Sequence, residues 1–268
     1  MKIAFYICLF ILGACFGSFL CCQARRLRLR EERGKKAVKK LGSRSVCLHC
    51  KAQLKWYDNI PIVSWLVLAG KCRSCHHRIG ALEFLSEVGL AAAFLAIGTT
   101  IDIATADVIT WVIFGLILLL TLALGFLAIY DGAYGELPMR QLIIAIALGF
   151  TISIIKQSRI IALAGFAPSI FINSLGSVAI LGGLYLLLYL ISKGKWVGDG
   201  DWLLGIAIGL ALNDPWLALA TLFISNILAS FVMLPFYIKN RQKQIYFGPF
   251  MVIAFVIVIT FSNFMLLI

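Results

Sequence analysis

Two carboxylates stand at the edges of long apolar runs, and together they could hydrolyse a peptide bond. Asp131 closes one run and Asp201 opens another. Two carboxylates that share a site also share a proton, because both cannot ionise cheaply. The ionised member can then activate a water molecule, while the protonated member donates a hydrogen bond to the developing oxyanion. Asp131 and Asp201 are therefore the candidate catalytic residues of an aspartic protease.

The residues around these carboxylates favour a site built where helices meet. Gly198 and Gly200 precede Asp201 and would let a neighbouring backbone approach closely. A charge beside hydrocarbon is costly, so a carboxylate at a membrane edge suggests a function. The structural alternative is that both aspartates only cap helix ends. Glu136 and Asp199 could each replace one member of the pair.

Four of the eight cysteines form two pairs that could hold a metal ion. The pairs are Cys47-Leu-His-Cys50 and Cys72-Arg-Ser-Cys75, with 21 residues between them. Two such pairs can present four thiolates to one ion, and tetrahedral Cys₄ coordination is typical of structural zinc sites. Disulfides are the alternative, although a reducing compartment disfavours them. A module of this size has a small core, so metal binding would supply folding free energy. We expect a zinc site formed by Cys47, Cys50, Cys72 and Cys75.

The elements that carry these residues are predicted to be membrane helices. Of the 268 residues, 62% are hydrophobic and 13% are charged, against roughly 25% charged residues in soluble domains. About 20 apolar residues cross the hydrocarbon core of a bilayer. The sequence predicts an all-α polytopic membrane protein with about eight transmembrane helices. The predicted spans are 3–22, 82–98, 108–130, 137–155, 173–192, 201–213, 215–236 and 249–268.

The positive charges predict how these helices are oriented. Of the 24 Lys and Arg residues, 15 fall in residues 23–80, and cytoplasmic loops carry an excess of such charges. With the N-terminus outside and 23–80 cytoplasmic, 21 of the 24 lie on the cytoplasmic side. The net charge of +12 thus indicates orientation and attraction to anionic membrane lipid rather than nucleic-acid binding. We expect a first helix (1–22), a cytoplasmic basic segment with the Cys₄ module (23–80) and a membrane domain (81–268).

Along nearly its whole length the sequence resembles the type IV prepilin peptidase family. Gly17-Ser-Phe-Leu20 and the cysteine module resemble the family's N-terminal features in content and order. Asp131, seven residues before Pro138, is similar to the first catalytic motif, and Gly198-Asp-Gly-Asp201 is similar to the GxGD motif that carries the second catalytic Asp. Phe247-Gly-Pro-Phe250 resembles the start of the family's last span. The resemblance marks as supporting motif residues Gly198, Gly200, Pro138, Gly248 and Pro249.

Three positions depart from the family pattern. Cys21 stands where Asn is usual, and Met139 stands where Asn or Asp is frequent. Leu203 replaces a Lys that usually follows the second catalytic Asp by two residues. If that Lys positions substrate or tunes the carboxylates, the activity of this chain would be altered. None of these changes removes a catalytic carboxylate.

The resemblance implies an intramembrane aspartic endopeptidase of the bacterial cytoplasmic membrane. Such enzymes cleave the leader peptide of type IV prepilins and pseudopilins at the cytoplasmic face. Many also N-methylate the new N-terminus with S-adenosylmethionine. Two other interpretations remain open from the residues alone: a transporter whose carboxylates bind ions or relay protons, and an inert assembly subunit that docks through its zinc module. The particular pilin substrate and the oligomeric state are not indicated by the sequence.

Overall fold

The computed structural model describes residues 2–34, 45–47, 49–194, 197–240 and 246–262, with only the backbone described for 233–240. The chain forms two compact units, Met1–Leu95 and Ala96–Ile268. Part of the predicted basic segment (35–44) and the end of the last predicted span (263–268) lie outside the described residues. The division proposed from the sequence, at residues 22 and 80, stays a prediction.

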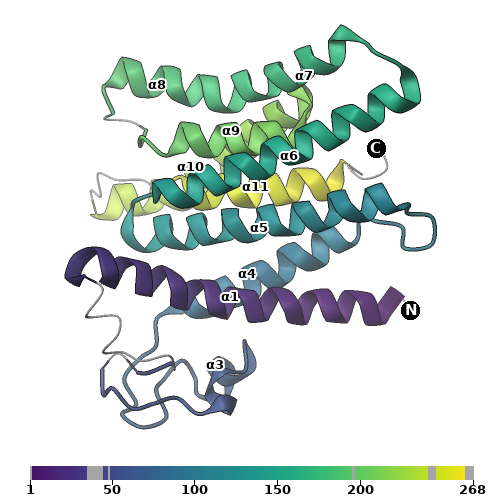
Figure 1. Ribbon diagram of the computed structural model, residues 1–268. Coiled ribbons are helices and arrows are strands. Elements are labelled where there is room, and N and C mark those ends of the chain that lie inside the picture. The colour runs from purple at the N-terminus through teal and green to yellow at the C-terminus, as the bar shows by residue number, and fades with distance from the viewer. Residues whose placement is uncertain (1, 35–44, 48, 195–196, 241–245, 263–268) are drawn as a thin grey trace. The chain divides into compact units, whose positions relative to one another are not determined.

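The described residues contain helices and no β-strand (Figure 1), apart from two isolated β-bridges in the cysteine module. The first unit contains α1 (Lys2–Arg33), η1 (Trp56–Asn59), α3 (Val63–Val67) and most of α4 (Ala81–Gly98). The second unit contains α5 (Val108–Tyr134), α6 (Met139–Ala164), α7 (Pro168–Val178), η2 (Ala179–Gly183), α8 (Leu184–Ser192), α9 (Asp201–Leu212), α10 (Pro215–Asn240) and α11 (Gly248–Phe261). The segment η2 is a π-helical turn that joins α7 and α8 into one continuous helix.

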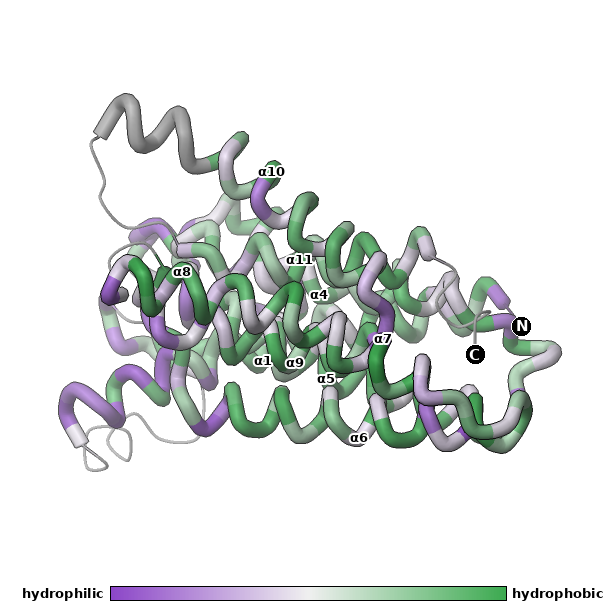
Figure 2. The backbone as a smooth tube through the Cα atoms, turned by 90° about the horizontal axis from the view of Figure 1, so that it is seen from above, coloured by the Kyte–Doolittle hydropathy of each residue, from purple (hydrophilic) through white to green (hydrophobic). Residues whose placement is uncertain are grey.

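Every predicted span overlaps a helix of the described residues, and the prediction of an all-helical, multi-pass membrane protein is confirmed. Within the described residues, six helices are long and apolar enough to cross a membrane, and α9 and α11 are shorter apolar helices. Hydrophobic residues cover most of the helical segments in Figure 2, and hydrophilic residues gather at their ends. The six long spans are Lys2–Arg33, Ala81–Gly98, Val108–Tyr134, Met139–Ala164, Pro168–Ser192 and Pro215–Val232.

In the first unit, α1 and α4 pack closely because two glycines four residues apart face α4. A Cβ on Gly13 would lie 2.5 Å from the Leu90 carbonyl oxygen, and one on Gly17 would lie 2.4 Å from that of Ser86. This small-xxx-small spacing lets the backbones of two apolar helices touch, so that van der Waals contact holds them together.

In the second unit, the short helix α9 lies between α6 and the α7–α8 helix (Figure 1), and it contacts both. Glycines make this possible on each side. A Cβ on Gly149 of α6 would lie 2.4 Å from the Ala207 carbonyl oxygen, and one on Gly205 would lie 2.5 Å from that of Leu181. A helix that is apolar all round needs apolar neighbours on every side. The neighbouring helices supply these apolar contacts, so α9 is held in place although it is short. Its first residue is Asp201.

Candidate functional site

Asp131 lies in the last turns of α5, where the first residue of α11 holds its carboxylate. The Asp131 side chain is buried, with 6% of the residue exposed. Its Oδ2 accepts a hydrogen bond of 2.9 Å from the backbone N–H of Gly248. That N–H is one of the free donors at a helix N-terminus, which carries a partial positive charge and favours an anion. The fold thus places this carboxylate against the N-terminus of α11, which begins 117 residues further along the chain.

Asp201 is the first residue of α9, and its carboxylate is held by the preceding turn. It is also buried, at 7% exposed, and its Oδ2 accepts a 2.9 Å hydrogen bond from the backbone N–H of Gly198. Gly200 is the N-cap residue of α9. A Cβ on Gly198 would lie only 3.3 Å from the same carboxylate oxygen. Gly198 therefore lies against the acid of this motif, and Gly200 caps the helix that the acid begins.

The two carboxylates are close enough to interact electrostatically. Their helices are brought together indirectly, since α5 and α9 each pack against both α6 and α11. Pro138 is the N-cap residue of α6, and Pro249 is at the start of α11, where its missing N–H costs nothing. Two buried acids with one oxygen each fixed by a backbone donor form an arrangement that can share a proton and activate water.

The other acids considered from the sequence lie in different surroundings. Asp199 and Glu136 are exposed. Asp107 caps α5 through the backbone N–H of Thr110, whose hydroxyl also lowers the pKa of Asp107. Asp214 accepts from the backbone N–H groups at the start of α10, at 2.7 and 3.0 Å. These last two roles are structural, and they leave Asp131 and Asp201 as the buried aspartates of the second unit's described residues.

Tyr185 is a residue of this site that the sequence did not reveal. It is buried on α8, interacts electrostatically with Asp201, and its hydroxyl accepts a 3.2 Å hydrogen bond from the Asn226 side chain. Its ring lies 5.2 Å, centroid to centroid, from the ring of Phe247, which directly precedes Gly248. A tyrosine inside an apolar run carries no distinguishing signal in one sequence, so only the fold identifies it.

The four module cysteines come together as expected. One sulfur from each of Cys47, Cys50, Cys72 and Cys75 lies within 4.8 Å of all the others. The Cys47 and Cys75 sulfurs are 3.8 Å apart, far beyond the roughly 2.05 Å of a disulfide bond. Around a tetrahedral zinc with bonds of about 2.3 Å, sulfurs would lie roughly 3.8 Å apart. The cluster can therefore hold a metal ion.

The two cysteine pairs sit on matching turns. The carbonyl of Cys47 accepts from the N–H of Lys51, and the carbonyl of Cys72 accepts from the N–H of His76, both at 2.9 Å. Lys51 and His76 have φ of 60° and 55°, a left-handed conformation that tightens each turn. The turns close on the bridges Val46–Gln53 and Lys71–Arg78. This repeated geometry aims both pairs of thiols at one point.

The thiols of the cluster differ in acidity. A hydrogen bond from the backbone N–H of Cys50 lowers the pKa of Cys47 to about 6. At Cys75 the backbone N–H of His77 also lowers the pKa, but desolvation and the neighbouring thiols outweigh it and raise the pKa to about 11. Four thiols so close together ionise jointly only if a cation offsets their charge.

Comparison with known proteins gives the same family for both parts of the chain. The family model of the Bacterial Peptidase A24 N-terminal domain matches residues 11–101. A prepilin leader peptidase/N-methyltransferase of Bacillus subtilis is 30% identical over 215 residues, covering 80% of this chain and 77% of the relative.

Two more relatives carry the same name. The protein of Pseudomonas aeruginosa is 29% identical over 270 residues, covering 94% of this chain and 89% of the relative. That of Legionella pneumophila is 27% identical over 247 residues, covering 87% and 77%. No solved structure matches the chain. The chain belongs to the prepilin leader peptidase/N-methyltransferase family.

Proposed function

We propose that this chain removes the leader peptide from prepilins or pseudopilins, with Asp131 and Asp201 as the catalytic pair. The buried carboxylates of α5 and α9, of which Asp201 acts electrostatically on Asp131, carry this proposal. One acid activates water for attack on the scissile carbonyl, and the other donates a proton to the oxyanion. The N–H groups of Gly248 and Gly198 hold one oxygen of each acid in place.

We propose that the site faces the cytoplasm of a bacterial cell. The positive-inside distribution of Lys and Arg supports a topology with the N-terminus outside and with residues 23–80 and the loops beside Asp131 and Asp201 inside. The basic leader peptide of a membrane-inserted precursor would lie on that same face. The relatives' names favour this peptidase over the ion-coupled transporter considered from the sequence.

The metal of the cysteine cluster is proposed to be zinc. Four thiolates in a closed cluster suit tetrahedral zinc, and no open ligand position is needed for a structural role. Bound there, zinc would supply folding free energy to the module. The cluster is then a structural centre, separate in sequence from the acids.

The second proposed activity is N-methylation of the new N-terminus with S-adenosylmethionine. The names of the relatives include this activity. The sulfonium of that molecule makes its methyl carbon an electrophile. The residues of this chain have to bind the donor and keep it beside a neutral amine, since only the neutral form has a lone pair to attack the methyl carbon.

Replacement of either acid tests the peptidase. Asp131→Asn and Asp201→Asn should each lower cleavage of a co-expressed prepilin by at least roughly 10³-fold, with the protein still in the membrane. Glu136→Gln, five residues from Asp131 and exposed, is the matched control and should cleave normally. Cleavage that persists in both catalytic variants would remove the assignment.

A further inference from the structure

One segment of the cysteine module, residues 60–69, is apolar although the polar insertion around it is highly charged. It reads Ile-Pro-Ile-Val-Ser-Trp-Leu-Val-Leu-Ala and contains no charged residue. Residues 23–80, which enclose it, hold 15 of the chain's 24 Lys and Arg residues. An apolar run of about 10–14 residues is too short to span a bilayer, and it is typical of a buried core helix or of an interfacial or re-entrant segment. The structure distinguishes between these two cases.

The apolar side chains of this segment point away from the protein. Its helix is α3, in which the exposed fractions of Val63, Leu66 and Val67 are 53%, 57% and 73%. Ile60, which precedes α3, is 39% exposed. A core helix would bury these side chains, so the segment fits an interfacial position instead.

The other side of α3 is attached to α4. The ring of Trp65 stacks on that of Phe84, with the ring centroids 4.6 Å apart. The backbone N–H of Ile62, the N-cap residue of α3, donates a 2.7 Å hydrogen bond to Oε2 of Glu87. Phe84 and Glu87 belong to the first two turns of α4, a helix long and apolar enough to cross a membrane. Thus α3 lies beside a membrane span rather than beyond its end.

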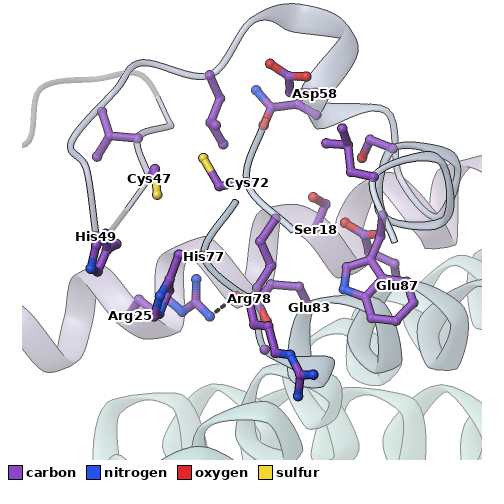
Figure 3. A pocket seen from close by; sticks show the side chains of 18 residues that line it. Ser18, Arg25, Cys47, His49, Asp58, Cys72, His77, Arg78, Glu83 and Glu87 are labelled. Atoms are coloured by element: carbon purple, nitrogen blue, oxygen red, sulfur yellow. Dashed lines mark hydrogen bonds and ion pairs between the residues drawn. The ribbon is translucent and has the colours of Figure 1, made fainter. Parts of the chain in front are cut away.

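An ion pair indicates how deep this position is. Arg25 of α1 pairs with Glu83 of α4, as the dashed line in Figure 3 shows. It is the first charged residue of α1 after Lys2, so the pair marks the edge of the apolar part of both helices. Glu87 follows Glu83 by four residues, which is about 6 Å along a helix. The start of α3 is therefore about 6 Å inside this edge, within the roughly 5–10 Å to which interfacial helices insert.

The backbone of the segment is paired as contact with lipid requires. In hydrocarbon, each backbone N–H needs a partner within the protein. Seven N–H groups between positions 63 and 71 donate to carbonyls of residues 60–68, at 2.6–3.1 Å. The N–H of Ile62 donates to Glu87, and Pro61 has no N–H to pair. This segment can therefore enter a leaflet without exposing these donors to hydrocarbon.

The residues on either side of the apolar run are those that favour a membrane surface. Lys55 and Lys71, one before the run and one after it, are both exposed, and lysines near a bilayer attract anionic headgroups. Trp56 is 78% exposed, and tryptophan is enriched at the level of the headgroups. A lipid surface suits both the apolar face of α3 and the cations that flank it.

We propose that α3 enters the leaflet beside α4 and holds the cysteine module against the bilayer. Val63, Leu66 and Val67 contact acyl chains, Trp56 lies among the headgroups, and the flanking lysines contact anionic lipid. The module is then held at the membrane by α3 as well as by the spans α1 and α4. The proposal does not depend on the peptidase activity, so its failure would leave that activity unaffected.

Photo-crosslinking from α3 tests this proposal. The full chain is placed with purified prepilin in vesicles of phosphatidylethanolamine and phosphatidylglycerol, and p-benzoylphenylalanine replaces Leu66 in one variant and Val67 in another. Both side chains are exposed, so their replacement removes little packing within the protein. After irradiation, the intact mass of each variant should increase by that of one phospholipid. The control is the same replacement at Ser74, which is exposed in the turn of the second cysteine pair and should form at least tenfold less lipid adduct.

Resistance of residues 45–80 to limited proteolysis, compared with that of the parent, checks that each variant is folded. A lipid adduct from the α3 positions that exceeds that from Ser74 supports the proposal. An adduct of twice the chain's mass, or one with the prepilin, would show that this face binds a second copy or the substrate, and would overturn it. Equal lipid labelling from Ser74, or no adduct from either α3 position, would overturn it as well.

Discussion

Gly200, the residue before Asp201, lies against the side chain of Leu137, the residue before Pro138. A Cβ on Gly200 would be 2.6 Å from the Cβ of Leu137, closer than two such carbons ever lie. The two acidic motifs, 70 residues apart in sequence, therefore touch through a glycine and a leucine. Their spacing fixes the start of α9 relative to the end of α5, and with it the position of one acid relative to the other.

Adding a methyl group at Gly200 should separate the acids. We expect Gly200→Ala to lower prepilin cleavage by roughly 10²-fold, because a displacement of about 1 Å at a reacting centre costs that much. The measurement is the cleavage rate in membranes at equal protein amount. Gly183→Ala, whose Cβ would meet nothing closer than 3.9 Å, is the control. Leu137→Gly, which removes the Cβ that would clash, should restore part of the loss in the double variant, and an additive loss would contradict the contact.

The N-terminus of α11 offers a second test. A Cβ on Gly248 would lie 2.8 Å from Oδ2 of Asp131, so Gly248→Ala should displace the carboxylate from the N–H that holds it. Cleavage should fall by roughly 10²-fold, with little effect on the amount of folded protein. Gly115→Ala on α5, where a Cβ would meet nothing within 4 Å, should leave the rate unchanged. An active Gly248 variant would mean that this hydrogen bond does not position the acid.

Sequence patterns located some of these features and missed others for physical reasons. Apolar length and charge located the helices, since the bilayer constrains both. Asp131 and Asp201 stood out as candidates because carboxylates beside hydrocarbon are rare, and their roles stay predictions. Tyr185 did not stand out, because an aromatic residue in an apolar run reads as lipid-facing or core. Which partner a glycine touches is decided only by the fold.

One boundary shows the same limit. The fourth span was predicted as residues 137–155, which ends one residue before Lys156. The helix α6 instead continues to Ala164, and Lys156 is buried at 6% exposed. Its ammonium donates a 3.1 Å hydrogen bond to the Leu212 carbonyl at the end of α9. A partner 56 residues away is not visible from local hydropathy.

Metal removal should unfold the cysteine module. We expect about one zinc per chain, lost when Cys47 and Cys72 are replaced by Ser, because two remaining thiols cannot complete a tetrahedral site. Loss of the metal removes folding free energy, so the segment 45–80 should become sensitive to limited proteolysis. Metal analysis and protease digestion measure the two effects. Cys8→Ser with Cys15→Ser, both exposed on α1, is the control pair. A folded, protease-resistant module without metal would contradict the zinc proposal.

Tyr185 should support the acid pair through its hydroxyl. That hydroxyl accepts from Asn226, and the tyrosine interacts electrostatically with Asp201. Tyr185→Phe keeps the ring beside Phe247 and removes one polar group, so we expect cleavage to fall about tenfold, the equivalent of about 1.4 kcal/mol. Because a positioning role changes the pair's proton affinity, the pH profile of cleavage should shift as well. The control is Tyr189→Phe, one turn along α8, which should change neither the cleavage rate nor its pH profile. An unshifted pH profile in Tyr185→Phe would mean that Tyr185 contributes only packing.

Lys156 should stabilise the fold rather than the chemistry. The last carbonyls of a helix have no partner within it, and a cation at that end also interacts favourably with the partial negative charge of the helix dipole. Lys156→Met leaves the buried Leu212 carbonyl without this donor, so the free energy of unfolding should fall by about 1–3 kcal/mol. Thermal unfolding in detergent measures it, with Lys193→Met, exposed at the end of α8, as the control. Lys156 contacts the C-terminal end of α9, whereas Asp201 is at its start and Asp131 is at the end of α5. The cleavage rate of the folded variant should therefore match the parent's. A variant as stable as the parent would show that the desolvation penalty of the buried ammonium equals the free energy that its hydrogen bond contributes.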